Sequence, residues 1–124
     1  MSIKPLKLHG ASQSPNPVKV GILLEELGIP YEGLKVPEVK EEPFISLNPN
    51  GRVPALEDPN TGVTIFESGA ILEYLIATYD KENKLNHPSG QDHWTEKSFL
   101  HFQMSGQGPY FGQFAWFSNF HGEV

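Results

Sequence analysis

A helical pattern at residues 17–28, between two short strand-like runs, is the feature that most limits how this 124-residue chain can fold. Pro17 suits the first position of a helix, and Gly28 suits its end. Four apolar residues can line one face at helical spacing: Val18, Ile22, Leu23 and Leu27. The flanking runs at residues 6–10 and 31–36 complete a predicted β-α-β unit.

A hairpin and a longer helix are predicted to follow. Residues 52–58 and 63–67 are strand-like, and residues 59–62 form a turn between them. Residues 68–80 are strongly patterned as a helix, with four residues spaced to face one side: Ile71, Leu72, Leu75 and Tyr79. With a short helix at residues 41–48, the order β-α-β-α-β-β-α predicts one α/β layered domain.

The character of the chain changes after residue 80. Residues 81–90 are polar with proline and glycine, which is typical of an interdomain linker. An aromatic-rich segment follows, with these side chains: Trp94, Phe99, Phe102, Tyr110, Phe111, Phe114, Trp116, Phe117 and Phe120. Gly106, Gly108 and Pro109 are expected to interrupt a helix there. One or two helices cannot bury so much aromatic surface alone, so they need further helices, the first domain or another chain.

Some of these aromatic residues have two interpretations. Tyr110, Phe111, Phe114 and Trp116 could line a hydrophobic co-substrate pocket. Aromatic side chains are more often core, and that interpretation is favoured for most of them.

The composition excludes several functional classes. A net charge of −6 argues against a general nucleic-acid binder, and the absence of cysteine excludes disulfides, thiolate metal sites and a cysteine nucleophile. The five histidines show no tight ligand spacing, so no metal site is expected. No secretory signal and no run of about 20 apolar residues is visible, which predicts a cytoplasmic protein that does not bind membranes.

Two short motifs carry residue types that could bind a ligand. Glu67 and Ser68 open the helix at residues 68–80, where an acid and a hydroxyl suit an N-cap and the helix dipole. Pro54 suits an ordinary edge strand, and Arg52 suits a solvated surface cation. On residue types alone, the structural roles of Glu67, Ser68 and Pro54 are favoured over binding, while Arg52 suits a ligand contact and a surface cation about equally.

Taken together, the motifs resemble the glutathione transferase superfamily. That family's glutathione-binding core is similar to NPNGRVPALED and TIFESGAILEYL, and its first strand, active-site loop and first helix are similar to KLHGASQSPNPVKVGILLEELGIPYE. The resemblance covers residues 4–80 strongly and continues more weakly from Gln91. The later stretch FLHFQMSGQGPYFGQ is most similar to the fungal branch typified by the yeast nitrogen-regulator prion protein, while the loop is also similar to the plant phi class.

The resemblance implies a fold and a domain organisation. Residues 1–80 would form a thioredoxin-like glutathione-binding domain, and residues 81–90 a linker. Residues 91–124 would be the first helix region of a truncated all-α domain, because the family's second domain is much longer.

The resemblance also assigns roles to both motifs. Glu67 would pair with the ammonium group of the γ-glutamyl end of glutathione, and Ser68 with the helix amides would receive its carboxylate. Pro54 would be cis and would expose the backbone of Val53, which pairs with the cysteinyl part like an added strand. Arg52 lies where relatives often place a polar ligand contact. The helix end would thus be both a cap and a binding site.

Lys40 falls where similar enzymes hold the glycyl carboxylate of glutathione with a lysine. Phi-like relatives place a histidine just before it, and here that position is Val39. The segment at residues 35–42 is also short beside the fungal relatives, and a solvated lysine is the structural alternative.

The loop before the first helix carries the candidates for stabilising the glutathione thiolate. Ser14 matches the catalytic serine of phi-like members, Asn16 matches the asparagine of fungal and bacterial relatives, and Ser12 is a register-shifted alternative. Some other classes would place the serine at Gln13, which has no hydroxyl. A donor near a helix N-terminus stabilises a thiolate, although all three candidates also suit a turn or cap.

The function that the resemblance implies is a glutathione-dependent transferase. It would direct the glutathione thiolate to a hydrophobic small molecule, and a homodimer is expected. Glutathione-assisted cis/trans isomerisation, reduction driven through glutathione disulfide, and a non-catalytic protein-interaction module are the alternatives.

Overall fold

The computed structural model describes residues 2–122. The chain divides into two compact units, one ending at Glu82 and the other beginning at Asn83. The first unit contains these elements: β1 (Leu6–His9), α1 (Pro15–Leu27), β2 (Tyr31–Leu34), α2 (Phe44–Leu47), β3 (Ala55–Asp58), β4 (Val63–Phe66) and α3 (Ser68–Tyr79). This order confirms the predicted β-α-β-α-β-β-α pattern and the thioredoxin-like α/β fold.

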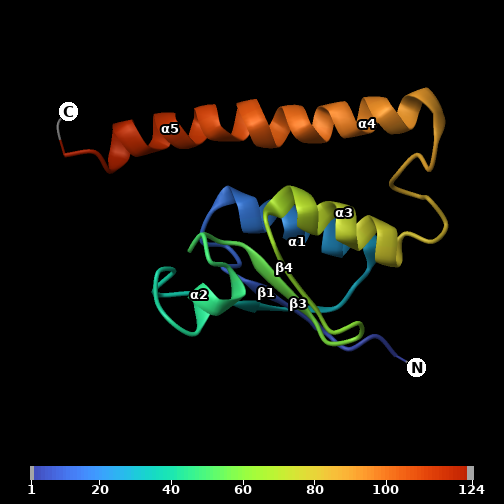
Figure 1. Cartoon of the computed structure of the whole chain (residues 1–124), viewed down its shortest axis with the longest axis horizontal. Coiled ribbons are helices and arrows are strands. Elements are labelled where there is room, and N and C mark those ends of the chain that lie inside the picture. The colour runs from blue at the N-terminus through green and yellow to red at the C-terminus, as the bar shows by residue number, and fades with distance from the viewer. Residues whose placement is uncertain (1, 123–124) are drawn as a thin grey trace. The chain divides into compact units, whose positions relative to one another are not determined.

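The sheet of the first unit has four strands in the order β2-β1-β3-β4. β1 pairs parallel with β2 and antiparallel with β3, which pairs antiparallel with β4. Helices α1 and α3 lie side by side on one face, and the short α2 lies on the other (Figure 1). β1 of the β-α-β unit therefore pairs with β3 of the hairpin, and these two central strands join the two parts of the sheet.

The main core lies between the sheet and the two long helices. Leu6, Leu8 and Leu56 project from the central strands and are buried against Ile71 and Leu75 of α3. Ile71 and Leu75 confirm the predicted apolar side of this helix. A smaller cluster of Val36, Phe44 and Ala55 forms a second core.

The predicted core face of α1 is wrong in part. Val18 is 46% exposed and Ile22 is 60% exposed, while Val20 and Leu24 are fully buried. Both sets of residues fit helical spacing, and only packing against the sheet and α3 selects one of them.

The first turn of α1 also begins earlier than expected. Pro15, not Pro17, is the first residue of the helix, and both prolines fall where backbone N–H groups need no helical partner. Gly28 ends the helix as predicted, with φ 65° and its N–H donated to the carbonyl oxygens of Leu24 and Glu25.

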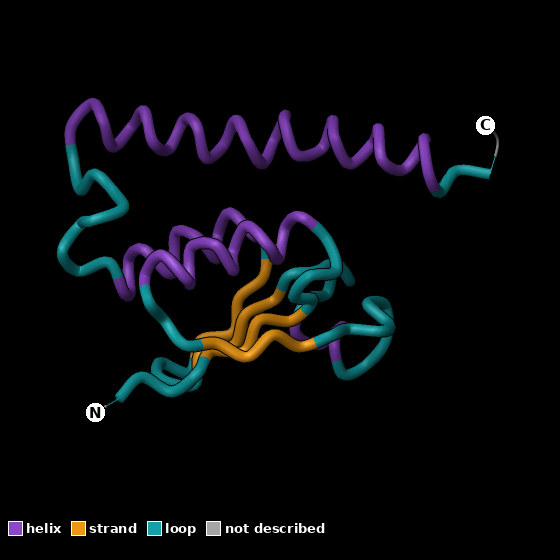
Figure 2. The backbone as a smooth tube through the Cα atoms, turned by 180° about the vertical axis from the view of Figure 1, so that it is seen from behind, coloured by secondary structure: helices purple, strands orange, loops and turns teal. Residues whose placement is uncertain are grey.

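The second unit is one nearly continuous helix. It comprises α4 (Gly90–Phe102), the π-helical turn η1 (Gln103–Gln107) and α5 (Gly108–Asn119), drawn as an unbroken purple coil in Figure 2. The expected interruption is therefore only a local change from α-helix to a π-helical turn, and the helix does not break there. Gly106 lies in the wide turn, and Pro109 lies in the first turn of α5, where proline is tolerated.

The aromatic side chains of the second unit are exposed, which corrects the expectation that most are core. Tyr110, Phe114 and Trp116 are 80%, 72% and 53% exposed, respectively, and Phe111 is also exposed. A single helix has no second layer against which to bury them. Within residues 2–122, none of the helices combines the length and apolar character that a membrane span requires.

Candidate functional site

The sheet register brings most candidate residues to one end of the first unit. His9 pairs with Ala55, and Ala55 pairs with Phe66. Gly10 follows His9, Pro54 precedes Ala55, and Glu67 follows Phe66. These three residues therefore lie at the same end of the sheet. The loop that leads into α1 also starts there, so the candidate thiol-stabilising residues and the two motifs converge.

Glu67 occupies the N-cap position of α3 in an unusual conformation. Its backbone has φ 71° and ψ 116°, and its carbonyl oxygen accepts the N–H of Ile71 at 2.9 Å. The Glu67 side chain makes no capping hydrogen bond within the described residues, so the predicted side-chain cap is wrong. Positive φ is uncommon for a non-glycine residue and concentrates at functional sites. Ser68 is the first residue of α3 and is 8% exposed.

Lys19 is a charged neighbour of Glu67 that the sequence analysis missed. It lies on α1, which packs against α3, and its ammonium group interacts electrostatically with the Glu67 carboxylate. Burial lowers the pKa of Lys19, and the negative charge of Glu67 opposes that shift only in part. The sequence could have indicated Lys19, because it lies one helical turn after the candidate Asn16 and therefore on the same side of α1.

The loop after β1 lies directly against the residues that precede β3. A Cβ atom built on Gly10, whose φ is +85°, would lie only 2.3 Å from the Cβ of Val53. Val53 is half-buried, Pro54 is buried, and the peptide bond between them is cis. The backbone of Val53 therefore sits beside the candidate thiol-stabilising loop.

A buried asparagine organises the turn that presents Val53. Asn48 is 2% exposed, and its Nδ2 donates to the Arg52 carbonyl oxygen at 2.5 Å. Its Oδ1 accepts the N–H of Asn50 at 3.0 Å, and its own carbonyl oxygen accepts the N–H of Gly51 at 2.8 Å. The sequence analysis does not predict this role for Asn48, the first residue of the stretch NPNG.

Lys40 reaches the same turn from the segment after β2. Its ammonium group donates to the carbonyl oxygen of Asn50 at 2.7 Å, and its side chain lies against Gly51. The structure thus brings Lys40 close to Arg52, whose side chain is exposed. Two cationic residues therefore lie at one turn.

The candidates for thiolate stabilisation lie on different parts of one loop. Ser14 is half-buried at the N-cap of α1 in extended backbone, and Asn16 is exposed in the first turn of that helix. Ser12 is exposed with φ 63°. Ser14 makes no side-chain capping hydrogen bond within residues 2–122, so its predicted structural role as a cap is not observed.

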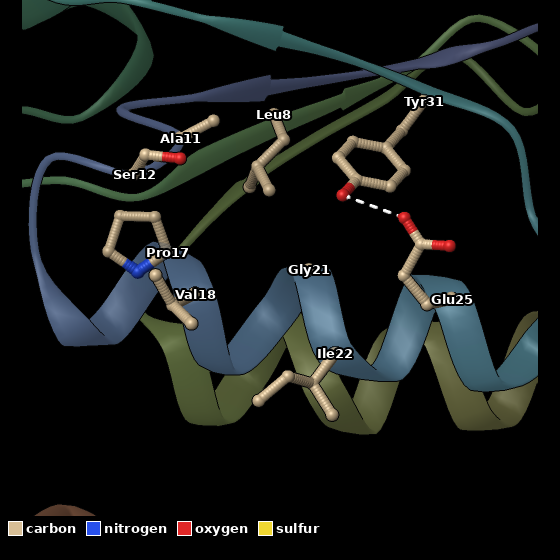
Figure 3. A pocket seen from close by; sticks show the side chains of 9 residues that line it. All are labelled: Leu8, Ala11, Ser12, Pro17, Val18, Gly21, Ile22, Glu25 and Tyr31. Carbon is tan, nitrogen blue, oxygen red and sulfur yellow. Dashed lines mark hydrogen bonds between the residues drawn. The ribbon is translucent and has the colours of Figure 1, made fainter.

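A cavity of about 230 Å³ lies between α1 and the strands β1 and β2 (Figure 3). Apolar side chains dominate it, and the Tyr31 hydroxyl donates to the Glu25 carboxylate at 3.1 Å at one end. Of the candidate site residues, Ser12 alone lines this cavity. The positions of Ser14 and Asn16 are therefore separate from it.

No cluster of metal-ligating side chains occurs in the part of the chain that the structure describes. The candidate groups are instead the Glu67 carboxylate, hydroxyl and amide side chains, lysine side chains and the backbone of Val53. These groups suit an extended ligand with both ammonium and carboxylate ends.

Comparison with protein families gives one match over most of the first unit. Residues 4–77 match the family described as "Glutathione S-transferase, N-terminal domain". The glutathione S-transferase-like protein OpS6 of Beauveria bassiana is 53% identical over 117 residues, which are 93% of this chain and 54% of that protein. Protein URE2 of Candida maltosa is 40% identical over 123 residues, covering 92% of this chain and 37% of that protein.

A solved structure extends the similarity to both units. The crystal structure of a glutathione transferase homolog from Lodderomyces elongisporus, with two GSH per subunit, has a TM-score of 0.92 and 40% sequence identity. The match covers 98% of this chain and 60% of that chain. The chain thus spans about half the length of OpS6, and less of the URE2 protein.

Proposed function

Because the chain belongs to the glutathione S-transferase family, with fungal Ure2 proteins among its relatives, we propose that it is a glutathione-dependent transferase. In this proposal the end of the sheet binds glutathione, and the bound thiolate attacks a hydrophobic electrophile. The observation that carries the proposal is the conformation of Glu67. Its strained N-cap backbone points to a role beyond helix capping, because its carboxylate does not cap α3 within the described residues.

The γ-glutamyl end of glutathione fits the start of α3. The Glu67 carboxylate would bind the ligand's ammonium group, while the Ser68 hydroxyl and the first amides of α3 would donate to its carboxylate. Lys19 adds a positive charge beside the same position. The pairing of opposite charges would orient this end of the ligand in only one direction.

The remaining parts of glutathione fit the turn before β3. The Val53 backbone would pair with the cysteinyl part as an added strand, since the regular pairing of β3 begins at Ala55. The glycyl carboxylate would then lie toward Lys40 and Arg52, which flank that turn. This order places the thiol next to the loop at residues 10–16.

The first turn of α1 supplies the chemistry. A hydrogen bond from Ser14 or Asn16, assisted by the positive end of the helix dipole, would stabilise the thiolate. The thiol proton leaves to solvent, and the sulfur electron pair forms the new bond to the electrophilic carbon. In a substitution, the leaving group departs with its electron pair. In an addition, a proton from solvent is taken up by the substrate.

Three further statements belong to the same proposal. The domain boundaries would be residues 1–80, 81–90 and 91–124, with the last segment forming part of an all-α domain. The protein would act as a homodimer in the cytoplasm.

Calorimetric titration with glutathione tests the proposal. The wild-type chain should bind saturably, and Glu67→Ala should bind at least about tenfold more weakly, because a charge-assisted contact is lost. Glu26→Gln, at an exposed acid on α1, is the control and should bind like wild type. No binding by folded wild type, or equal binding by Glu67→Ala, would reject the assignment.

Product analysis separates transfer from the other chemistries. Glutathione conjugates of an aryl halide support the transferase, turnover of cis alkenes supports an isomerase, and consumption of glutathione disulfide supports a reductase. The exposed aromatic residues of α4 and α5 favour an interaction module as the second candidate. Glutathione binding without any turnover, together with capture of a specific protein, would favour that module.

A further inference from the structure

Gln13 makes two hydrogen bonds to the backbone of one residue across the first unit. Its Nε2 donates to the carbonyl oxygen of Val36 at 2.9 Å, and its Oε1 accepts the Val36 N–H at 2.6 Å. Its own backbone N–H donates to the carbonyl oxygen of Gly10 at 3.0 Å. The carboxamide therefore ties the loop after β1 to the segment after β2.

The carboxamide continues the pairing of two strands beyond their last residues. β1 and β2 end at His9 and Leu34, and the Gly10 N–H still donates to the Leu34 carbonyl oxygen at 2.7 Å. A carboxamide carries the same donor and acceptor pair as a peptide group. Val36 is 5% exposed, so its backbone groups need partners inside the protein.

The bonded pair fixes the middle of the candidate thiolate-stabilising loop. Gln13 stands between Ser12 and Ser14, so its side-chain bonds set the direction in which the chain enters α1. Val36 belongs to the second core with Phe44 and Ala55, which anchors the pair to the sheet. Ala11 adds a close contact, because a Cβ atom on Gly33 would lie 2.8 Å from the Cβ of Ala11.

We propose that Gln13 is a positioning residue: its carboxamide, bonded to the Val36 backbone, holds Ser14 and Asn16 at the place where they stabilise the glutathione thiolate. The inference rests on the proposed function. Gln13 does not touch the reacting atoms, and its effect passes through the loop. A loop displaced by about 1 Å can cost up to about a hundredfold in rate, so a fixed loop is part of the chemistry.

Two readouts on Gln13→Ala test the inference. The first is hydrogen exchange at the Val36 amide, which needs no ligand. The second is the pKa of the bound glutathione thiol, obtained from thiolate absorbance as a function of pH. Glutathione affinity is measured for the same variants. Gln13→Glu keeps the acceptor for the Val36 N–H but loses the donor. Gln91→Ala removes an exposed amide that donates to Thr95 on α4, and serves as the control.

The expected result separates thiolate stabilisation from binding. In Gln13→Ala the Val36 amide exchanges at least about tenfold faster, and the thiolate fraction at a fixed pH falls about threefold to tenfold. Glutathione affinity changes less than the thiolate fraction, because Glu67 and Val53 are untouched. Gln13→Glu should lower the thiolate fraction at least as far as Gln13→Ala, because one carboxylate oxygen would face the Val36 carbonyl oxygen and the added negative charge disfavours a nearby thiolate. Gln91→Ala should match wild type.

Two outcomes overturn the inference. If wild type binds glutathione and Gln13→Ala keeps the wild-type thiol pKa, Gln13 does not position the loop for this chemistry. If hydrogen exchange at the Val36 amide is also unchanged, the Gln13 side chain does not bond to the Val36 backbone. If wild type fails to bind glutathione, the proposed function is rejected and with it this role for Gln13. Hydrogen exchange at the Val36 amide then shows separately whether Gln13 bonds to Val36.

Discussion

Gly10 and Val53 are in such close contact that a Cβ atom on Gly10 would lie 2.3 Å from the Cβ of Val53. The first residue after β1 and the residue before the cis peptide bond therefore fit only because one of them has no side chain. This contact brings the candidate thiolate-stabilising loop to the backbone that is proposed to bind the cysteinyl part of glutathione.

Gly10→Ala should destabilise the protein by about 2–4 kcal/mol, from a strained positive φ together with overpacking against Val53. Gly28→Ala isolates the first effect, because Gly28 has φ +65° and no atom within 4 Å of the added Cβ. It should cost only about 1 kcal/mol. Urea unfolding of both variants measures the difference, and equal losses would contradict the steric argument.

Asn48→Ala should weaken both the fold and glutathione binding. The change leaves the Arg52 carbonyl oxygen and the Asn50 N–H without their buried partner, at a cost of about 2–3 kcal/mol. Because the turn presents Val53, glutathione affinity should fall at least about fivefold. Urea unfolding and calorimetry measure the two effects.

The control for Asn48 is Asn119→Ala, which removes an exposed amide that donates to the Ala115 carbonyl oxygen. Its stability and glutathione affinity should stay at the wild-type values. A loss in Asn119→Ala as large as that in Asn48→Ala would show that burial of Asn48 is not the cause.

The Lys19–Glu67 interaction should be measurable as a coupling energy. Glu67 is exposed, so a double-mutant cycle of Lys19→Met and Glu67→Gln should give only about 0.5–1 kcal/mol at low salt. The coupling should shrink as salt screens the charges. Unfolding free energies in low and high salt measure it, and zero coupling at low salt would show that the two charges do not interact.

Asp58 should be the carboxylate whose loss costs most stability in the first unit. It is 2% exposed and accepts hydrogen bonds from the hydroxyls of Tyr74 at 2.6 Å and Tyr79 at 2.5 Å. Asn60 adds bonds from its backbone N–H at 2.8 Å and its Nδ2 at 3.0 Å. Asp58→Asn should cost about 2–4 kcal/mol in urea unfolding, and Tyr79→Phe about 1–2 kcal/mol.

The Asp58 carboxylate also predicts how the free energy of unfolding falls at acid pH. Burial pushes the Asp58 pKa up, but the hydrogen bonds from Tyr74, Tyr79 and Asn60 outweigh it and hold the pKa below its usual 3.8. The folded state then binds fewer protons than the unfolded state at acid pH. The stability from Asp58 is present above about pH 5 and is lost as pH falls through the lowered pKa.

Unfolding free energies measured from pH 6 down to about pH 3 test this slope. Asp58→Asn should reduce the slope, and Asp92→Asn, at an acid exposed on α4, should not. An unchanged slope in Asp58→Asn would mean that other carboxylates control acid unfolding.

The order of elements in the first unit could be predicted from the sequence. Local patterns carry that information: Gly28 ends α1, Ile71 and Leu75 mark the buried side of α3, and the turn at residues 59–62 makes the hairpin. The Glu67–Ser68 motif could also be placed at the start of α3, because a helix start has a local signature. The convergence of Pro54 and Glu67 follows from strand register, which the sequence did not show.

Local patterns in the sequence specify which segments are helices and strands and where the candidate binding side chains lie along the chain, because helix and strand preferences depend on residues a few positions apart. Packing in three dimensions selects Val20 rather than Val18 for burial, and it brings Gln13 to Val36 and Tyr79 to Asp58. These partners lie about 20 residues apart in the chain. Their meeting depends on sheet register and helix packing, which local periodicity does not encode.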